Sequence, residues 1–420
     1  MRKILISLTS LLAMIGGVAL APLTQADPIF SIAAVTAVGP SGSTYNSFDL
    51  ALTHDGARAY VANAGNRTVS VIDTTTNLII GSLINVGAAP NAVAVSPDDE
   101  FVYVSNGYAN TVSVIDTTTN TVVATVNVRH GSTGLAFNQD GSRVYVNTQD
   151  QNGNGAVEVI DTATNTLLST SGLPITVGNT PTGAAFSPDF THLYVTNTAD
   201  GTVSVIDTNI AHSGTTYDTV TALITVGYRP QGLAVSPDGS QLLVANLDDS
   251  VSVIDTSTNV VSTTLSGFDD PKDVAFSPDG ANAYVTNLMG KSVTRIKVAE
   301  LSTADIGLDV GWYPLGIVVS SDGRSIYLTN DVPDGTVTVI AINEPASGPN
   351  VPTAPMQAYG RNSDGTCTND APLWVNWEGI ASQQFSSWGL SWQQWPNNGT
   401  GGFVCQRQPY YTTAEKWSVR

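Results

Sequence analysis

Cysteine is scarce in this sequence, which has only Cys367 and Cys405 among its 420 residues. No Cys-x-x-Cys-His motif occurs, so covalent attachment of haem is not indicated. The chain also lacks a Gly-x-Ser-x-Gly elbow, a phosphate-binding loop and a His-Glu-x-x-His motif. These absences remove the commonest sequence signatures of hydrolases, nucleotide-binding enzymes and zinc proteases. The four histidines do not have the spacing of metal ligands.

Basic residues are also few, with 16 Lys and Arg against 35 Asp and Glu and a formal net charge of −19. Nearly all of this negative charge falls within residues 27–343. Such a surface repels a polyanion, so we expect no nucleic-acid partner. The acidity favours solubility outside the cytoplasm, and cation binding is the alternative interpretation.

Long apolar runs are absent after the first residues, so we expect no membrane span. Arg2-Lys3 precedes an apolar stretch from Ile4 to Leu20, and Thr24-Gln25-Ala26 ends in a small residue. This order is typical of a cleaved signal peptide over residues 1–26. Cleavage after Ala21 is the alternative, but Pro22 disfavours it. We therefore expect a secreted, periplasmic or cell-surface protein.

What the chain does contain is a phrase that occurs seven times. One copy reads Tyr194-Val195-Thr196-Asn197, a polar link, and then Val203-Ser204-Val205-Ile206-Asp207-Thr208. An apolar run ending in Ser-Pro-Asp-Gly or a variant of it precedes most copies. The Tyr positions, with Leu243 in place of Tyr in the fifth copy, are 60, 103, 145, 194, 243, 284 and 327. A spacing of 41 to 49 residues with several short strands per unit predicts a β-propeller.

Each part of the phrase predicts one piece of a four-stranded blade. The small apolar run is the innermost strand, and Ser-Pro-Asp-Gly is a turn in which Pro presets φ and Gly accepts a positive φ. Tyr-Val-x-Asn is the second strand, and we expect its Asn to close the strand in a left-handed turn conformation. Val-Ser-Val-Ile-Asp-Thr is the third strand, which is apolar on both faces as in a buried sheet.

Counting strands predicts how the ring closes. The seventh copy ends near residue 343 after three strands, whereas residues 29–38 form a strand that belongs to no copy. We therefore predict an all-β, seven-bladed propeller in which the N-terminal strand joins the last blade and closes the ring. Closure removes exposed sheet edges.

The repeated Tyr-Val-Thr-Asn and Val-Ser-Val-Ile-Asp-Thr resemble the YVTN family of β-propeller repeats, found in bacterial and archaeal surface and exported proteins. The resemblance covers about residues 45–343. It implies the propeller fold, and the repeat of that family contains no catalytic residue. The repeat is also similar to propellers of lactonases and of haem-containing nitrite reductases. The lack of a consistently placed His argues against the haem proteins.

The end of the chain differs in composition. Residues 344–355 are rich in Pro, Ser, Gly and Ala and predict a linker. Residues 356–420 predict a small Trp-rich domain, stapled by a Cys367–Cys405 disulfide because export brings an oxidising compartment. Trp388, Trp392 and Trp395 suit stacking on sugars or docking to a protein, but the favoured interpretation is a compact core.

An insertion in the third repeat, Asp150-Gln151-Asn152-Gly153-Asn154, offers a candidate calcium loop. Oxygen-bearing side chains at Asp150, Asn152, Asn154 and Glu158 follow the spacing of calcium ligands, with Gly155 at the sixth position. The loop resembles those of calcium-binding propellers such as integrins. The favoured alternative is an Asn/Gly-rich hairpin turn, with Glu158 pointing into a blade interface. We expect no other cofactor.

Two functions follow from these patterns. The first is an exported, non-catalytic binding scaffold for a protein or carbohydrate at the cell surface. The second is a lactonase-like hydrolase that uses acidic residues of the central channel, for which Asp49 and Asp273 are the candidates. Because the other inner strands are small and apolar, we favour binding. A redox role is a third hypothesis that the missing haem motifs disfavour, and the oligomeric state stays open.

Overall fold

The structure is a computed structural model that describes residues 27–39, 47–168, 174–208 and 218–343, together with four short strands beyond residue 355. The chain divides into two compact units, Phe30–Asn343 and a second unit made of Met1–Ile29 and Glu344–Arg420. In the second unit, β31 (Met356–Ala358) pairs with β32 (Leu373–Val375), and β33 (Trp392–Gln394) pairs with β34 (Gly401–Phe403). Among the residues that the structure describes, no helix has the length and apolarity needed to cross a membrane.

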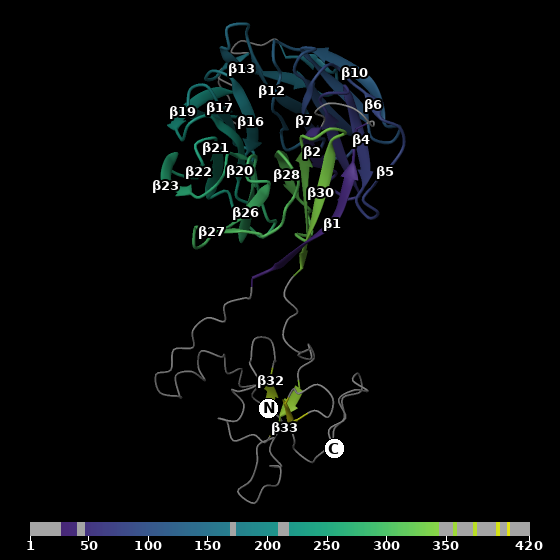
Figure 1. The fold of residues 1–420 in the computed structure, drawn as a ribbon. Coiled ribbons are helices and arrows are strands. Elements are labelled where there is room, and N and C mark those ends of the chain that lie inside the picture. Colours follow the sequence, from purple (N-terminus) through teal and green to yellow (C-terminus); the bar gives the residue numbers. More distant parts are fainter. Residues whose placement is uncertain are drawn as a thin grey trace, which may run out of the picture. The chain divides into compact units, whose positions relative to one another are not determined.

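The first unit consists of seven antiparallel sheets, so the predicted seven-bladed, all-β fold is confirmed (Figure 1). Blades one to three comprise β2 (Ser47–Leu52), β3 (Arg58–Asn63), β4 (Thr68–Asp73), β5 (Leu78–Ile79) and β6 (Ile84–Asn85); β7 (Pro90–Val95), β8 (Phe101–Asn106), β9 (Thr111–Asp116) and β10 (Thr121–Asn127); and β11 (Leu135–Phe137), β12 (Arg143–Gln149), β13 (Gly155–Asp161), β14 (Thr166–Leu167) and β15 (Ile175–Thr176).

Blades four to six comprise β16 (Pro181–Phe186), β17 (His192–Asn197), β18 (Thr202–Asp207) and β19 (Thr219–Thr225); β20 (Pro230–Val235), β21 (Gln241–Asn246), β22 (Ser250–Asp255) and β23 (Val260–Ser266); and β24 (Pro271–Phe276), β25 (Asn282–Asn287), β26 (Ser292–Lys297) and β27 (Ser302–Asp305). Blade seven contains β28 (Pro314–Val319), β29 (Ser325–Asn330) and β30 (Thr336–Asn343).

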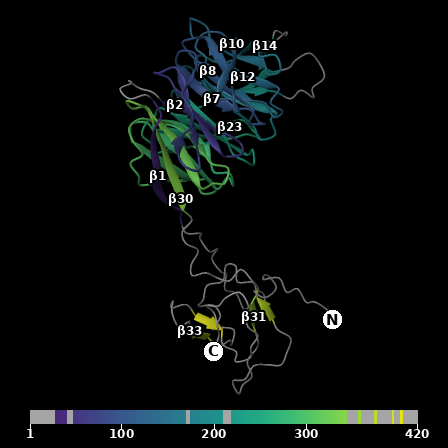
Figure 2. The same ribbon diagram turned by 90° about the vertical axis from the view of Figure 1, so that its right-hand side faces the viewer.

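The ring is continuous because the first strand of each blade contacts the first strand of the next, and β28 of blade seven contacts β2 of blade one. The seventh sheet has the order β1-β30-β29-β28, with β1 (Ile29–Ala37) on its outer side (Figures 1 and 2). Val38, just after β1, is fully buried and packs with Leu50 of blade one and Tyr327 of blade seven. The N-terminal segment therefore lies at the joint between the last blade and the first.

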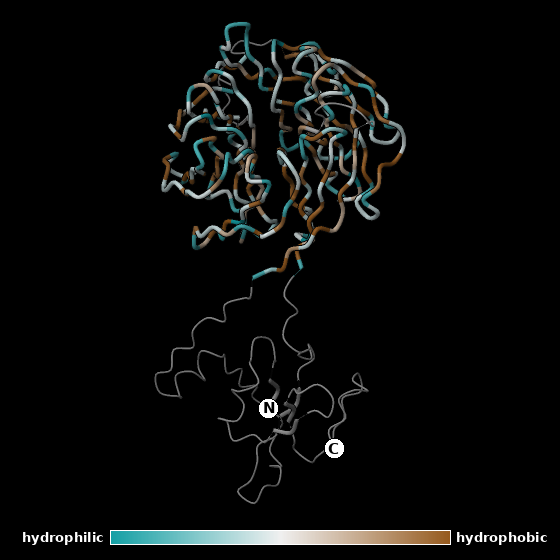
Figure 3. The backbone as a smooth tube through the Cα atoms, in the orientation of Figure 1, coloured by the Kyte–Doolittle hydropathy of each residue, from teal (hydrophilic) through white to brown (hydrophobic). Residues whose placement is uncertain are grey.

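The core lies between blades rather than inside a single layer. The second and third strands are buried along almost their whole length on both faces, as in β17 and β18. This is why their sequences lack the alternation of a one-sided sheet. Hydrophobic colour follows many strands and hydrophilic colour many turns in Figure 3. Aromatic rings fill the joints, for example Tyr103 packed edge-on against Phe137 of the next blade.

The turn chemistry of Ser-Pro-Asp-Gly is confirmed. Gly239 has a φ of 74° and Gly280 of 69°, in the left-handed region that favours glycine. The Ser236 hydroxyl donates to the Asp238 carboxylate, which also accepts the backbone N–H of Ser240 at 3.0 Å. These bonds lower the pKa of Asp238, with the serine hydroxyl as the largest cause.

The expectation for the Asn of Tyr-Val-x-Asn was wrong. Asn197 is buried at the end of β17 and is not among the residues with positive φ. Its amide Nδ2 donates to Thr202 Oγ1 at 3.0 Å and to Ser204 Oγ at 2.9 Å on the neighbouring strand β18. The Asn thus cross-links the second and third strands, because a buried amide must find hydrogen-bond partners.

Candidate functional site at the channel and the upper face

Loops of two kinds share one face of the propeller, which we call the upper face. They are the loops that lead into the inner strands and the loops that join the second strand of each blade to the third. The inner strands line the central channel, and their residues approach the next blade closely. A Cβ atom placed on Gly134 would lie 2.2 Å from the Thr182 carbonyl oxygen, so only glycine fits there. This explains why small residues predominate at the third position of the inner strand.

Two blades carry a carboxylate at that third position, Asp49 on β2 and Asp273 on β24. Asp49 Oδ2 accepts the backbone N–H of Val93 at 3.0 Å, and Asp273 Oδ2 accepts that of Ile317 at 3.2 Å. Each acid therefore bonds to the inner strand of the following blade. Each also lies against a glycine of the preceding blade, Gly316 for Asp49 and Gly232 for Asp273.

The structure brings these two acids to the same strand. Asp273 bonds to Ile317 of β28, and a Cβ on the adjacent Gly316 would lie 2.8 Å from Asp49 Oδ1. Blade seven is thus flanked at the channel by one carboxylate from each neighbouring blade. The sequence predicted that both acids lie at the central channel. Their positions on either side of β28 follow from the closed ring, which places blades six and one next to blade seven.

Burial raises the pKa of both carboxyls, because protein atoms surround them even though each keeps some contact with solvent. The pKa of Asp49 rises to about 6, against hydrogen bonds from Val93 and Leu50 that lower it. The pKa of Asp273 rises to about 7, with burial as the main cause and repulsion from Asp49 as the second. Near neutral pH the pair therefore holds a proton part of the time.

A cation that sequence reasoning missed lies next to Asp273. Lys272 Nζ donates to Gln231 Oε1 at 2.6 Å and lies 5.9 Å from the centre of the Phe48 ring. Burial lowers the pKa of Lys272, and the charge of Asp273 opposes that shift. The signal was present in the sequence, since the second position of the inner strand is uncharged in the other six blades.

The calcium candidates are placed in two groups. Asp150, Asn152 and Asn154 form the hairpin between β12 and β13, where Asp150 Oδ1 accepts the N–H of Asn152 at 2.7 Å and Asp150 Oδ2 accepts Asn154 Nδ2 at 2.7 Å. Glu158 lies four residues farther along β13, about 13 Å from Asn154 at the usual rise of a strand. Its Oε2 accepts the backbone N–H of Arg129 at 2.7 Å. The structure does not bring Glu158 to the loop.

Several exposed aromatic side chains lie in upper-face loops of different blades. Tyr108 is 87 % exposed, Tyr228 67 % and Trp312 56 %, and all three lie in upper-face loops. Lys291 Nζ lies 2.8 Å from the centre of the Trp312 ring. Phe48, Met289 and Tyr313 are also exposed on this face, whereas the other exposed large apolar residues of the described chain lie on outer strands. The sequence contained a signal for these exposed aromatics. Large side chains precede the first proline of the inner strand in Tyr228-Arg229-Pro230 and Trp312-Tyr313-Pro314, whereas blade two has only alanines before Pro90.

The predicted residues of the C-terminal region cannot be placed in the same way. Cys367, Cys405, Trp388 and Trp395 lie outside the described residues, and Trp392 is described only as part of the backbone of β33. The disulfide and the aromatic recognition site therefore stay predictions.

The repeated four-stranded sheets around one channel define this chain as a β-propeller protein. A family model described as a YNCE-like beta-propeller matches residues 154–342, from the third blade to the seventh. Among solved structures, Kuenenia stuttgartiensis hydrazine synthase is similar, with 21 % identity and a TM-score of 0.63 over 73 % of this chain and 98 % of that chain. At this identity the likeness shows the fold alone. None of the curated proteins matches.

Proposed function

We propose that this chain is an exported, non-catalytic β-propeller that binds a protein or carbohydrate partner through its upper face. The observation that carries the proposal is the exposure of Tyr108, Tyr228, Trp312 and Tyr313 in loops of one face. Aromatic side chains contribute much of the contact area in protein interfaces, and their flat faces also stack on sugar rings. Rigid strands hold these loops in place, which reduces the entropy lost on binding.

The channel acids support a structural role better than a catalytic one. In Asp49 and in Asp273, one carboxylate oxygen accepts a hydrogen bond from a backbone N–H of the next blade. A lactonase-like hydrolase is the second candidate, because carboxyls with raised pKa values beside a channel suit general acid–base chemistry. Hydrolysis of simple lactones that Asp273→Asn abolishes, with the melting temperature unchanged, would favour this alternative.

The binding proposal is tested with the full chain and the double variant Trp312→Ala/Tyr313→Ala. The wild-type protein is screened against a panel of glycans and isolated cell envelopes, and its affinity for the retained component is measured. We expect at least a tenfold loss of affinity in the double variant. The control Val123→Ala removes an exposed apolar side chain from the outer strand β10. Equal binding by all three proteins would contradict the proposal.

We further propose that residues 1–26 direct export and that Cys367 and Cys405 form a disulfide in the exported protein. Fusion of the first 40 residues to alkaline phosphatase, which is active only after export, tests the first point. Mass spectrometry of the non-reduced protein tests the second, since a linked peptide pair is expected and two free thiols would contradict it.

A further inference from the structure

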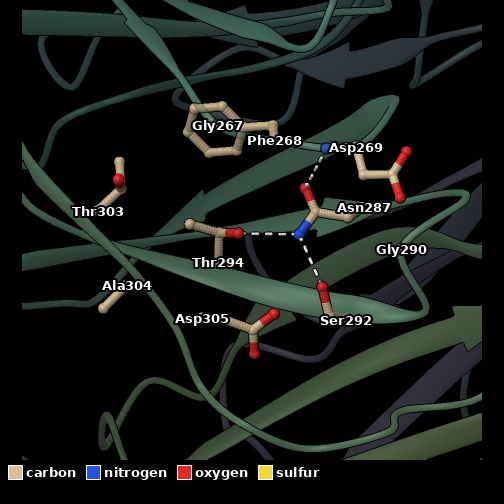
Figure 4. Close-up of a pocket in the computed structure, with 10 residues that line it drawn as sticks. All are labelled: Gly267, Phe268, Asp269, Asn287, Gly290, Ser292, Thr294, Thr303, Ala304 and Asp305. Carbon is tan, nitrogen blue, oxygen red and sulfur yellow. Dashed lines mark hydrogen bonds between the residues drawn. The ribbon is translucent and has the colours of Figure 1, made fainter.

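A pocket of 430 Å³ opens in blade six, beside the loop that joins β25 to β26 (Figure 4). Its wall is mostly polar and includes Asp269, Asp305, Asn287, Ser292 and Thr294, with Phe268 as the aromatic member. Pockets that hold small molecules usually have volumes of about 300–1,000 Å³, so this one has sufficient size. Of the residues in this wall, Asn287 is the Asn of the sixth Tyr-Val-x-Asn copy.

The pocket occurs where blade six departs from the repeat. In blade four, Ile224 pairs with Val203 and the N–H of Val226 bonds to the Gly201 carbonyl, with one residue between the two contacts. In blade six the matching bonds join Ile306 to Val293 and Val310 to Lys291, with three residues between them. Blade six therefore has two additional residues between these bonds, and β27 ends after four residues, whereas β19 has seven.

A second departure is Phe268, which occupies the place that Gly178 and Gly227 hold before other blades. In those blades the glycine lies directly on the Asn that ends the second strand; a Cβ on Gly227 would lie 2.6 Å from Asn246 Cγ. Phe268 instead turns into the core, where it packs with Leu243 and Val274 and is 7 % exposed. Space next to Asn287 is thereby left open.

The polar groups around that space have unused hydrogen-bonding capacity. Asn287 Nδ2 donates to Ser292 Oγ at 3.0 Å and to Thr294 Oγ1 at 2.8 Å, so both hydroxyl oxygens act as acceptors and their hydrogens can serve a ligand (Figure 4). Asp305 accepts one hydrogen bond, from the N–H of Gly307 at 2.6 Å. Among the described residues, none donates a hydrogen bond to the Asp269 carboxylate, and none forms an ion pair with either acid.

We propose that this pocket binds a small organic ammonium compound that also carries hydroxyl groups. Two carboxylates without a counter-ion favour a positive ligand, since a charge-assisted hydrogen bond is about twice as strong as a neutral one. The volume is far larger than a single ion needs, and the polar wall disfavours an apolar ligand. The hydroxyls of Ser292 and Thr294 match the hydroxyl groups of the ligand. This inference is independent of the proposed upper-face partner.

The experiment compares glucosamine with glucose. Glucosamine carries an ammonium group at the position where glucose has a hydroxyl. Binding to the full chain is followed by ligand-observed NMR at pH 6 in phosphate buffer that contains no other amine. We expect a Kd for glucosamine on the order of 1 mM, as the ligand efficiency of a molecule of this size suggests. Glucose should bind at least tenfold more weakly, and added NaCl should weaken glucosamine binding.

The variants Asp269→Asn and Asp305→Asn keep the shape of the side chains and should each weaken glucosamine binding about tenfold. Glu100→Gln is the matched control, because it removes one charge from an exposed side chain outside the pocket. Equal binding of glucose and glucosamine by the wild type, or no binding of either, overturns the proposal. That comparison remains decisive if a variant fails to fold.

Discussion

At the residue scale, two positions of the repeated phrase form hydrogen bonds that join neighbouring blades. The Tyr of the second strand reaches the next blade: Tyr60 OH bonds to Asn120 Oδ1 at 3.0 Å, and Tyr103 OH bonds to Asn165 Oδ1 at 2.5 Å. The third residue of Tyr-Val-x-Asn does the same toward the inner strand, as Thr196 Oγ1 donates to the Gln231 carbonyl at 2.7 Å. Blade joints are therefore polar as well as apolar.

The first prediction concerns the tyrosine bond. Tyr103→Phe keeps the ring packed against Phe137 but removes the donor to Asn165, so the free energy of unfolding should fall by about 1 kcal/mol. Urea denaturation of the purified protein measures this. Tyr108→Phe is the control, because Tyr108 is exposed and should leave stability unchanged. Equal stability of Tyr103→Phe and wild type would show that the hydrogen bond contributes nothing.

At the element scale, we propose roles for two segments, β1 and the β12–β13 hairpin. We propose that β1 closes the ring. Its support comes from Thr36 Oγ1, which donates to the Asn77 carbonyl of blade one at 2.6 Å, and from Ser70 Oγ, which donates to the Val38 carbonyl at 2.6 Å. Together with its place beside β30, these bonds connect the N-terminal segment to both blades that meet there.

Removing residues 27–40 should therefore lower the melting temperature of the whole propeller, because the last blade loses its outer strand and its joint with blade one. A smaller change gives a sharper test. Val38→Ala removes buried methyl groups and should cost about 1–3 kcal/mol. Val35→Ala, at a side chain that is 58 % exposed, should cost almost nothing. An unchanged melting temperature after the truncation would rule out closure by β1.

For the hairpin we propose weak calcium binding through Asp150, Asn152 and Asn154, with water completing the coordination. Ligand that binds only the folded protein raises its stability, so millimolar CaCl₂ should raise the melting temperature while MgCl₂ should raise it less. Asp150→Asn should abolish the calcium-dependent increase. Glu158→Gln should not, because Glu158 bonds to Arg129 away from the loop. Identical melting curves with and without calcium would leave the segment as a simple hairpin turn.

At the scale of the whole molecule, the acidic groups divide into two sets with opposite effects of pH. Hydrogen bonds lower the pKa of turn acids such as Asp238 and Asp279, with their serine partners as the largest cause. Their contribution to stability is present above the pKa of the unfolded chain and is lost in strong acid. Burial raises the pKa of Asp49 and Asp273 above the unfolded value, so the folded protein binds more protons and loses stability as pH rises.

The fourth prediction follows from this sign. Stability should fall between about pH 4, the pKa of an unfolded Asp, and about pH 7, the folded pKa of Asp273. Asp49→Asn/Asp273→Asn keeps an oxygen acceptor for Val93 and Ile317 but cannot ionise. Between pH 5 and pH 8, the melting temperature should therefore change less with pH in the double variant than in the wild type. A parallel loss of stability in both proteins would assign the pH dependence to other groups.

The sequence by itself determined the number of blades, the order of strands within each blade and the turn chemistry, because these depend on local periodicity and on residues such as Gly239 that suit one backbone conformation. It also pointed to Asp49 and Asp273 as the acids of the inner strands. Only the tertiary structure decided which groups meet across the ring. The bond of Lys272 to Gln231 joins residues 41 apart in the chain, and packing of neighbouring blades brings them together. The role of Asn197 depends on pairing of the second and third strands within one blade, which places its amide beside Thr202 and Ser204.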